Sequence, residues 1–276
     1  MGSTQFGNFG NFCRDSTLPV CNLLTNSHDQ TGGWGGCELT GIPLSGGRRL
    51  GNLGSILLCG IAIATAIYLI LRSERKKAAV GRREMQLFLV GYIVISICEI
   101  FTVGEFPLSS TVRIAFTGIH IGFIIATTWM LMLNAVVGYQ IHRRRYATVA
   151  RPHPGICNRK FQSSYEGPNY RNIALYVLYQ LAPLIFLVAF YVLETVLVLR
   201  VLGETRPMVY LTLAAVLFAL GQIFNYAISP HICNGTDGKI DGALFQTLFT
   251  LLSVVMVWVF WSSITEDDWP MPASYP

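Results

Sequence analysis

The sequence predicts an all-α membrane protein, a polytopic bundle of transmembrane helices in which six spans are visible. Of its 276 residues, 52% are hydrophobic and only 13% are charged, with a mean hydropathy of +0.48. Soluble domains carry about 25% charged residues. The apolar residues are gathered into long runs, and roughly 20 helical residues cross a hydrocarbon core of about 30 Å. Short alternating stretches typical of a membrane barrel are absent from the sequence, so the spans are expected to be helices.

Six apolar runs follow one another between an N-terminal segment, residues 1–50, and a C-terminal segment, residues 266–276. The runs are Leu53–Leu71, Leu87–Phe106, Ile114–Ile141, Ile173–Leu199, Met208–Ile228 and Ala243–Ile264. The second contains Glu99 and Glu105, the third His120 and the fourth Glu194, whereas the others contain no charge. Residues 51–265 are therefore expected to form one bundle embedded in the lipid bilayer.

A short loop between the first two runs is strongly basic. Its basic residues are Arg72, Arg75, Lys76, Lys77, Arg82 and Arg83. Because Lys and Arg accumulate in cytosolic loops, this loop is expected to face the cytosol, which places residues 1–50 in the lumen as a tail without a signal peptide. The net charge of +5 belongs to such loops and does not indicate nucleic-acid binding.

Four cysteines fall in segments that are expected to be lumenal, where cysteines tend to pair. Cys13, Cys21 and Cys37 lie in the tail and Cys233 lies between the last two runs. Four cysteines allow two bridges in three connectivities. Their spacing matches no zinc signature, and we expect neither a metal nor a cofactor. Asn234 begins an Asn-Gly-Thr sequon and is a candidate glycosylation site.

No catalytic pattern is visible. The sequence contains no HExxH, GxSxG or HxxxxD pattern and no paired aspartates within the apolar runs, so it does not indicate an enzyme. Several polar residues lie inside the apolar runs: Glu99, His120, Asn134, Glu194, Gln222 and Asn225. One interpretation is that they hold the bundle together through interhelical hydrogen bonds, each worth about 0.6 kcal/mol. The others are ion or proton conduction and contact with a partner helix, because intramembrane carboxylates are costly.

Six segments resemble motifs of the chitin synthase export chaperones of filamentous fungi. They are Ala79–Glu84, Leu131–Gly138, Phe190–Arg200, Gly221–Tyr226, His231–Asp241 and Val257–Pro270. The last reads Val257-Trp-Val-Phe-Trp-Ser-Ser-Ile-Thr-Glu-Asp-Asp-Trp-Pro270 and is the most distinctive. The resemblance covers nearly the whole chain and implies a chaperone of the endoplasmic reticulum membrane. Such a protein helps a chitin synthase to fold and leave for the cell surface, and so supports chitin and cell wall synthesis.

The resemblance also suggests roles for particular residues. Glu99 and Glu194 are candidate contacts with the client synthase, through helix faces that cover its spans. Glu266, Asp267 and Asp268 form an acidic tail, a candidate export signal read by a vesicle coat. The alternative for the tail is a solvated helix end.

One stretch, residues 141–168, departs from the family, which is usually described as having seven spans. Within it, residues 142–161 carry six basic residues and two prolines and cannot cross a bilayer. Six spans would place Cys233 and Asn234 in the cytosol, whereas seven place both in the lumen and the acidic tail in the cytosol. Either the stretch is a mistranslated or unspliced segment, which we favour, or it is genuine and the fourth run rearranges around Pro183.

Two other classes of protein compete with the chaperone. The first is a small transporter or receptor, favoured by the family's seven spans and the intramembrane carboxylates. The sequence shows no internal repeat and no pair of broken helices. The second is a membrane enzyme of lipid or polysaccharide synthesis, which the missing catalytic residues disfavour.

Overall fold

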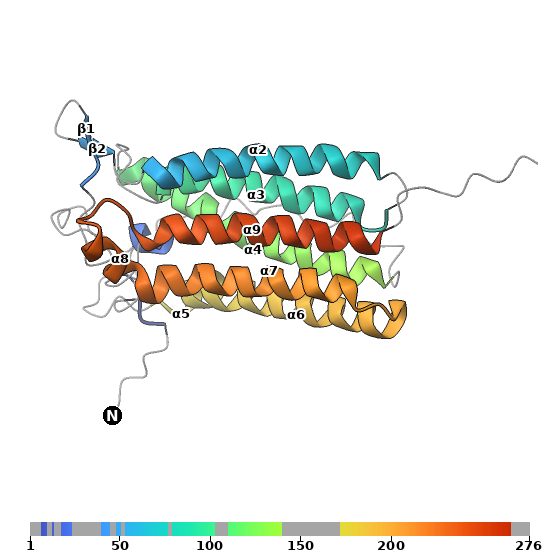
Figure 1. The fold of residues 1–276 in the computed structure, drawn as a ribbon. Coiled ribbons are helices and arrows are strands. Elements are labelled where there is room, and N and C mark those ends of the chain that lie inside the picture. The colour runs from blue at the N-terminus through green and yellow to red at the C-terminus, as the bar shows by residue number, and fades with distance from the viewer. Residues whose placement is uncertain are drawn as a thin grey trace, which may run out of the picture.

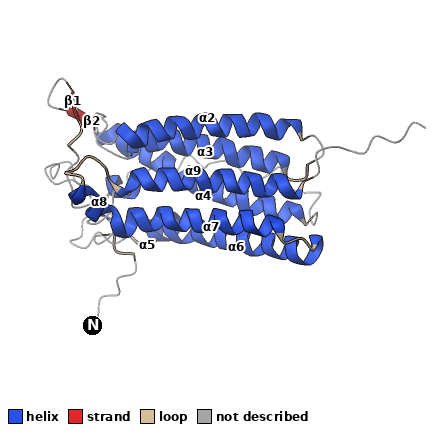
Figure 2. Ribbon diagram, viewed as in Figure 1, coloured by secondary structure: helices blue, strands red, loops and turns tan. Residues whose placement is uncertain are grey.

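The computed structural model describes residues 7–9, 13, 18–23, 40–44, 48–50, 53–76, 79–102, 110–139 and 172–265. Within these residues, six helical stretches are long and apolar enough to cross a membrane. They run side by side in one bundle (Figure 1, Figure 2). The predicted all-α bundle with six visible spans is confirmed. The predicted basic stretch, 141–168, and the acidic tail, 266–276, lie outside the described residues.

Four of the stretches are regular α-helices. They are α2 (Leu53–Arg75), α3 (Arg82–Thr102), α4 (Ser110–Gly138) and α9 (Gly242–Ile264). The bundle buries large apolar side chains such as Phe260, Met85, Leu89 and Leu211. Its outer surface exposes others, and Val209 is 65% exposed. Such an apolar exterior suits contact with lipid.

Two stretches are continuous helices with widened π turns. The first joins α5 (Ile173–Tyr176), η3 (Val177–Leu181), α6 (Ala182–Val196) and η4 (Leu197–Leu202); the second joins α7 (Arg206–Ile223), η5 (Phe224–Ile228) and α8 (Ser229–Gly235). Pro183 and Pro230 each follow a π turn, which relieves the clash of the proline ring with the carbonyl four residues earlier. The first stretch therefore passes through Pro183 without folding back, so the rearrangement considered for this run is not seen in it.

The helices α4 and α6 are neighbours and run parallel. Two contacts fall in order along both: Trp129 with Phe186, and Tyr139 with Leu193. Because the residue numbers rise together, α4 ends at one end of the bundle and α5 begins at the other (Figure 1). Tyr139 and Asn172, the described residues on either side of this gap, therefore lie at opposite ends of the bundle.

The two ends of the bundle carry different segments (Figure 1). The first end holds the described N-terminal residues, α8 and the start of α9, and we call it the N-terminal end. The other end holds the α2–α3 loop, the connection from η4 to α7 and the last turn of α9, and we call it the loop end. The ends of α2, α4 and α9 therefore lie on the same side of the bundle.

Parts of the N-terminal segment pack on the bundle. Phe9, Val20 and Cys21 are buried together with Ile121 of α4 and Tyr179 of η3. The segment also contains η1 (Pro19–Leu23) and an antiparallel hairpin of β1 (Ile42–Leu44) and β2 (Arg48–Leu50). The described residues from Phe9 to Cys21 are thus packed against the helices.

Candidate functional site

At the loop end, two tryptophans of α9 hold the α2–α3 loop. The indole N–H of Trp258 donates to the hydroxyl of Ser73 at 2.8 Å, and that of Trp261 donates to the carbonyl of Val80 at 3.0 Å. Residues three apart share a helix face, so one indole reaches the end of α2 and the other reaches the loop that follows it. A buried indole N–H needs an acceptor, and these bonds supply one.

The same loop is held from α4. Asn134 is 4% exposed and donates from its side-chain amide to the carbonyl of Gly81 at 2.8 Å. Gly81 has a φ of +73°, and a Cβ there would lie 2.6 Å from the Asn134 nitrogen. Glycine is therefore required both by the backbone conformation and by the close approach. We call Trp258, Trp261, Asn134 and Gly81 the tryptophan junction.

The junction joins three of the six family-like motifs, which are far apart in the sequence. Val80 and Gly81 belong to the first, Asn134 to the second and the two tryptophans to the last. Sequence reasoning picked out Asn134 only as one of several intramembrane polar residues. The signal that was available is a pair of tryptophans three apart near the end of an apolar run.

Glu99 of α3 is tied to α9. Its Oε1 accepts a hydrogen bond from the hydroxyl of Thr247. The bond joins helices that are distant in sequence, as the structural interpretation of Glu99 expects. Direct contact of Glu99 with a client stays a prediction.

Glu194 of α6 is 2% exposed, and its Oε2 has no hydrogen-bond partner in the described part of the chain. It lies where α4 ends against α6: the hydroxyl of Tyr139 donates to the carbonyl of Leu193 at 2.6 Å, and Gly138 approaches Leu197. A buried carboxyl group without a partner is costly, so this position remains a candidate for function. Contact with a client would require α4 and α6 to separate locally.

Other intramembrane polar residues bridge helices near the N-terminal end. His120 Nδ1 lies 3.0 Å from the hydroxyl of Thr102, and Asn225 donates to the Gln246 side chain. The carbonyl oxygen of Thr102 also accepts from Asn22 of η1 at 2.9 Å, which ties the N-terminal segment to α3. These contacts connect α3 with α4, η5 with α9 and η1 with α3, and supply no visible chemistry.

The cysteines fall into two groups. Cys13 and Cys21 form a disulfide, whereas Cys59 and Cys98 are free and buried within spans. Cys233 of α8 is also disulfide-bonded, to a partner outside the described residues. Cys37, the fourth candidate, is not among the described residues.

The sequon lies at the N-terminal end, on the last turn of α8. Asn234 is exposed, and the Thr236 hydroxyl donates to the carbonyl of Ile232 at 2.8 Å. Close by, the backbone N–H of Thr40 donates to the carbonyl of Gly238 at 2.9 Å. The segment that follows Cys37 therefore lies against the turn that follows Asn234.

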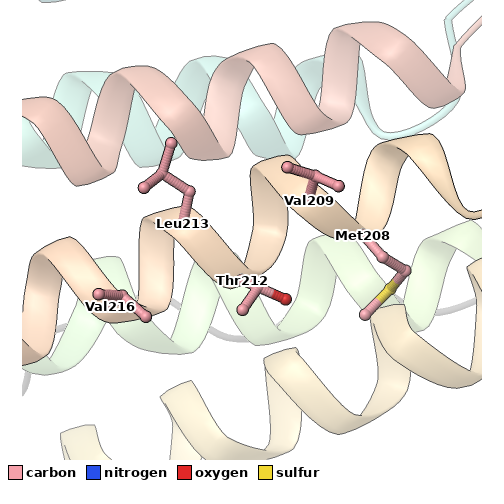
Figure 3. A pocket seen from close by; sticks show the side chains of 5 residues that line it. All are labelled: Met208, Val209, Thr212, Leu213 and Val216. Atoms are coloured by element: carbon pink, nitrogen blue, oxygen red, sulfur yellow. The ribbon is translucent and has the colours of Figure 1, made fainter.

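A hollow on the outer face of α7 has a volume of about 440 Å³ (Figure 3). Its lining residues are Met208, Val209, Thr212, Leu213 and Val216. None of them is ionisable, and they lie on one helix, so the hollow offers no convergent polar groups. Within the described residues, no cluster of three or more His, Cys, Asp or Glu side chains could hold a metal ion.

Comparison with known proteins gives a consistent family. The family model described as chitin synthase export chaperone matches residues 5–143 and 155–275. The protein of that name from Coccidioides immitis is 27% identical over 287 residues, which cover 96% of this chain and 84% of that protein. The one from Cryptococcus neoformans is 28% identical over 277 residues, covering 96% and 76% of the two chains. The one from Gibberella zeae is 28% identical over 283 residues, covering 95% and 83%. No solved structure matches the chain significantly.

The family match skips residues 144–154. This gap falls inside the stretch 141–168 that was predicted to depart from the family. The six motifs lie in the matched parts of the chain.

Proposed function

The chain belongs to the family of chitin synthase export chaperones, and from this premise we propose that it acts in the endoplasmic reticulum membrane on a chitin synthase client. There it helps the synthase to fold and to leave for the cell surface, and so supports chitin and cell wall synthesis. The family is one of chaperones and not of enzymes. The name of the family identifies the client as a chitin synthase.

The observation that carries the proposal is the match of the family over two long segments of the chain, combined with the tryptophan junction. Three family-like motifs meet there through the side chains of Trp261 and Asn134. Residues that hold a loop in place across three helices suit a protein that works by presenting a fixed surface to another membrane protein.

The proposal includes an orientation. The loop end carries Arg72, Arg75, Arg200 and Arg206, which favours the cytosol under the positive-inside rule. The N-terminal end then faces the lumen, where disulfides form and sequons are glycosylated. The parallel packing of α4 and α6 supports this orientation, because it places the last turn of α9 at the same end as the basic α2–α3 loop.

The second bridge of the lumenal end is proposed to join Cys37 to Cys233. Cys233 is disulfide-bonded, and Thr40, three residues after Cys37, contacts the turn at Gly238. Non-reducing digestion of the purified protein should yield a peptide containing both cysteines. A peptide that instead joins Cys233 to Cys157 would overturn this pairing.

For the acidic tail, we propose an export signal that a vesicle coat reads. The support is its composition, Glu266, Asp267 and Asp268, at the cytosolic end of the last helix. Replacing all three by Ala should slow the exit of the chaperone from the reticulum. Exit at the normal rate removes this part of the proposal.

The experiment that tests the function is the location of a fluorescently tagged chitin synthase in cells that lack this gene. The synthase should be trapped in the reticulum, and restoring this coding sequence should return it to the surface. Trp261→Phe and Asn134→Leu should restore it less well, whereas the outer-face variant Val209→Leu should restore it fully. A synthase that reaches the surface without the gene contradicts the export role.

A further inference from the structure

We propose that a basic surface at the loop end is the docking site of the chain's own acidic tail, residues 266–276. The basic surface consists of Arg72, Arg75, Lys76, Arg82 and Arg83. The occupant is the tail segment that contains Glu266, Asp267 and Asp268. The inference concerns a contact within the chain and does not depend on the proposed chaperone function.

The first step of the argument is charge. The basic surface holds five positive side chains, and its acidic neighbours are Glu74 and Glu84. Arg72, Arg75 and Arg83 are exposed, while Lys76 and Arg82 are half-buried. Within the described residues no ion pair neutralises the three exposed arginines. Three consecutive acidic residues complement this excess of positive charge.

The second step is where the tail begins. The ammonium group of Lys76 donates to the carbonyl of Ser262 at 2.8 Å, and the indole of Trp258 donates to Ser73 at 2.8 Å. These bonds fix the last turn of α9 beside the α2–α3 loop, as Figure 1 shows. The origin of the tail is thus held next to the basic surface.

The third step is reach. Helix α9 ends at Ile264, and the acidic residues follow two residues later. They lie four to six residues beyond Ser262, a span of about 13 to 20 Å when extended at roughly 3.3 Å per residue. A tail of this length can lay its three carboxylates across the arginines without any change in the helices.

The fourth step is a comparison with the other loop at the same end. The connection from η4 to α7 carries Arg200 and Arg206 with Glu204, a much smaller excess of positive charge. No hydrogen bond from this connection to the last turn of α9 is seen in the described residues. It therefore serves as the matched control.

A tail held on the α2–α3 loop is available to a cytosolic partner only after it detaches.

The test measures how fast a cysteine in the tail reacts with a membrane-impermeant maleimide, using the full-length protein in sealed reticulum vesicles. The probe is Ala273→Cys in a Cys157→Ser background. Neutralising the tail with Glu266→Gln, Asp267→Asn and Asp268→Asn should raise the labelling rate about tenfold, because three exposed ion pairs of ordinary strength together contribute roughly that factor. High salt should give the same increase in the unmodified tail.

The loop variant Arg82→Gln with Arg83→Gln should also speed labelling, whereas Arg200→Gln with Arg206→Gln should not. Exchanging charges, with Arg82→Glu and Arg83→Glu against a tail of three arginines, should restore slow labelling. If the tail variant speeds labelling and the loop variant does not, the tail docks elsewhere and the proposal is wrong. Equal rates in all variants and at all salt concentrations also overturn it, and leave anionic lipid headgroups as the counter-charge of the basic surface.

Discussion

Gly81→Ala is the substitution that tests the tryptophan junction most sharply. The φ of +73° at this position costs an L-residue roughly 1–2 kcal/mol. The new Cβ would also lie 2.6 Å from the amide nitrogen of Asn134, which must move and lose its 2.8 Å bond to the Gly81 carbonyl. An interhelical hydrogen bond in a membrane contributes about 0.6 kcal/mol on average and up to about 1.7. The total cost is therefore about 2–3 kcal/mol.

The two contributions can be separated with Asn134→Ala. That substitution alone loses the hydrogen bond, but the Gly81 carbonyl keeps the backbone N–H of Met85 at 2.9 Å. In the Asn134→Ala background the added methyl group of Gly81→Ala meets no amide, so only the backbone strain remains. The double variant should be more stable than the sum of the single effects predicts, by about 1 kcal/mol.

The assay is the thermal unfolding midpoint of the purified protein in detergent, where about 2 kcal/mol corresponds to a fall of about 5 °C. The matched control is Gly60→Ala on the outer face of α2, where a Cβ meets nothing within 4 Å. Since Ala favours a helix over Gly by about 1 kcal/mol, this control should leave the midpoint unchanged or raise it. A Gly81→Ala protein as stable as the parent, or full additivity with Asn134→Ala, would refute the described geometry of the junction.

Three further predictions follow from single features. Replacing Cys13 and Cys21 by Ser removes a disulfide with a sequence separation of 8 and should lower the free energy of unfolding by about 2–3 kcal/mol. The measurement is a lower thermal unfolding midpoint without reductant, and an unchanged midpoint argues against a structural bridge. Glu194→Leu replaces a buried carboxyl group whose Oε2 has no partner in the described part of the chain, so the variant should be at least as stable as the parent protein. If the carboxylate contacts the client, less synthase should copurify with the variant; full copurification removes Glu194 as a client contact. Endoglycosidase should shift the electrophoretic mobility of the parent protein, and Asn234→Gln should abolish this shift. A parent protein that shows no shift would mean that the sequon is unused.

The spans are the part of the fold that the sequence predicts well. The run Leu53–Leu71 became α2, and Ala243–Ile264 became α9 with a start only one residue earlier. Apolar length is a local property, and every backbone group of a helix in lipid must bond within its own segment. The helix ends moved where polar residues continue the hydrogen-bond pattern, as at Arg75 of α2.

The packing of the bundle could not be predicted in the same way. The parallel neighbours α4 and α6 depend on contacts such as Trp129 with Phe186, and the apolar periodicity of either helix does not specify them. The tryptophan junction is likewise formed by a loop carbonyl and side chains from two distant helices. Polar residues within the runs correctly pointed to interhelical bonds, as with Asn225 and Gln246, but their partners depend on the three-dimensional arrangement.

The central structural claim is that α4 and α6 run parallel, and the side of the membrane reached by each terminus tests it most directly. The measurement is protease protection of N-terminal and C-terminal tags in sealed reticulum vesicles, with and without detergent. Parallel α4 and α6 predict that the N-terminal tag is protected and the C-terminal tag is cleaved in intact vesicles. Protection of both tags would mean that the chain crosses six times, and would contradict the parallel arrangement of α4 and α6.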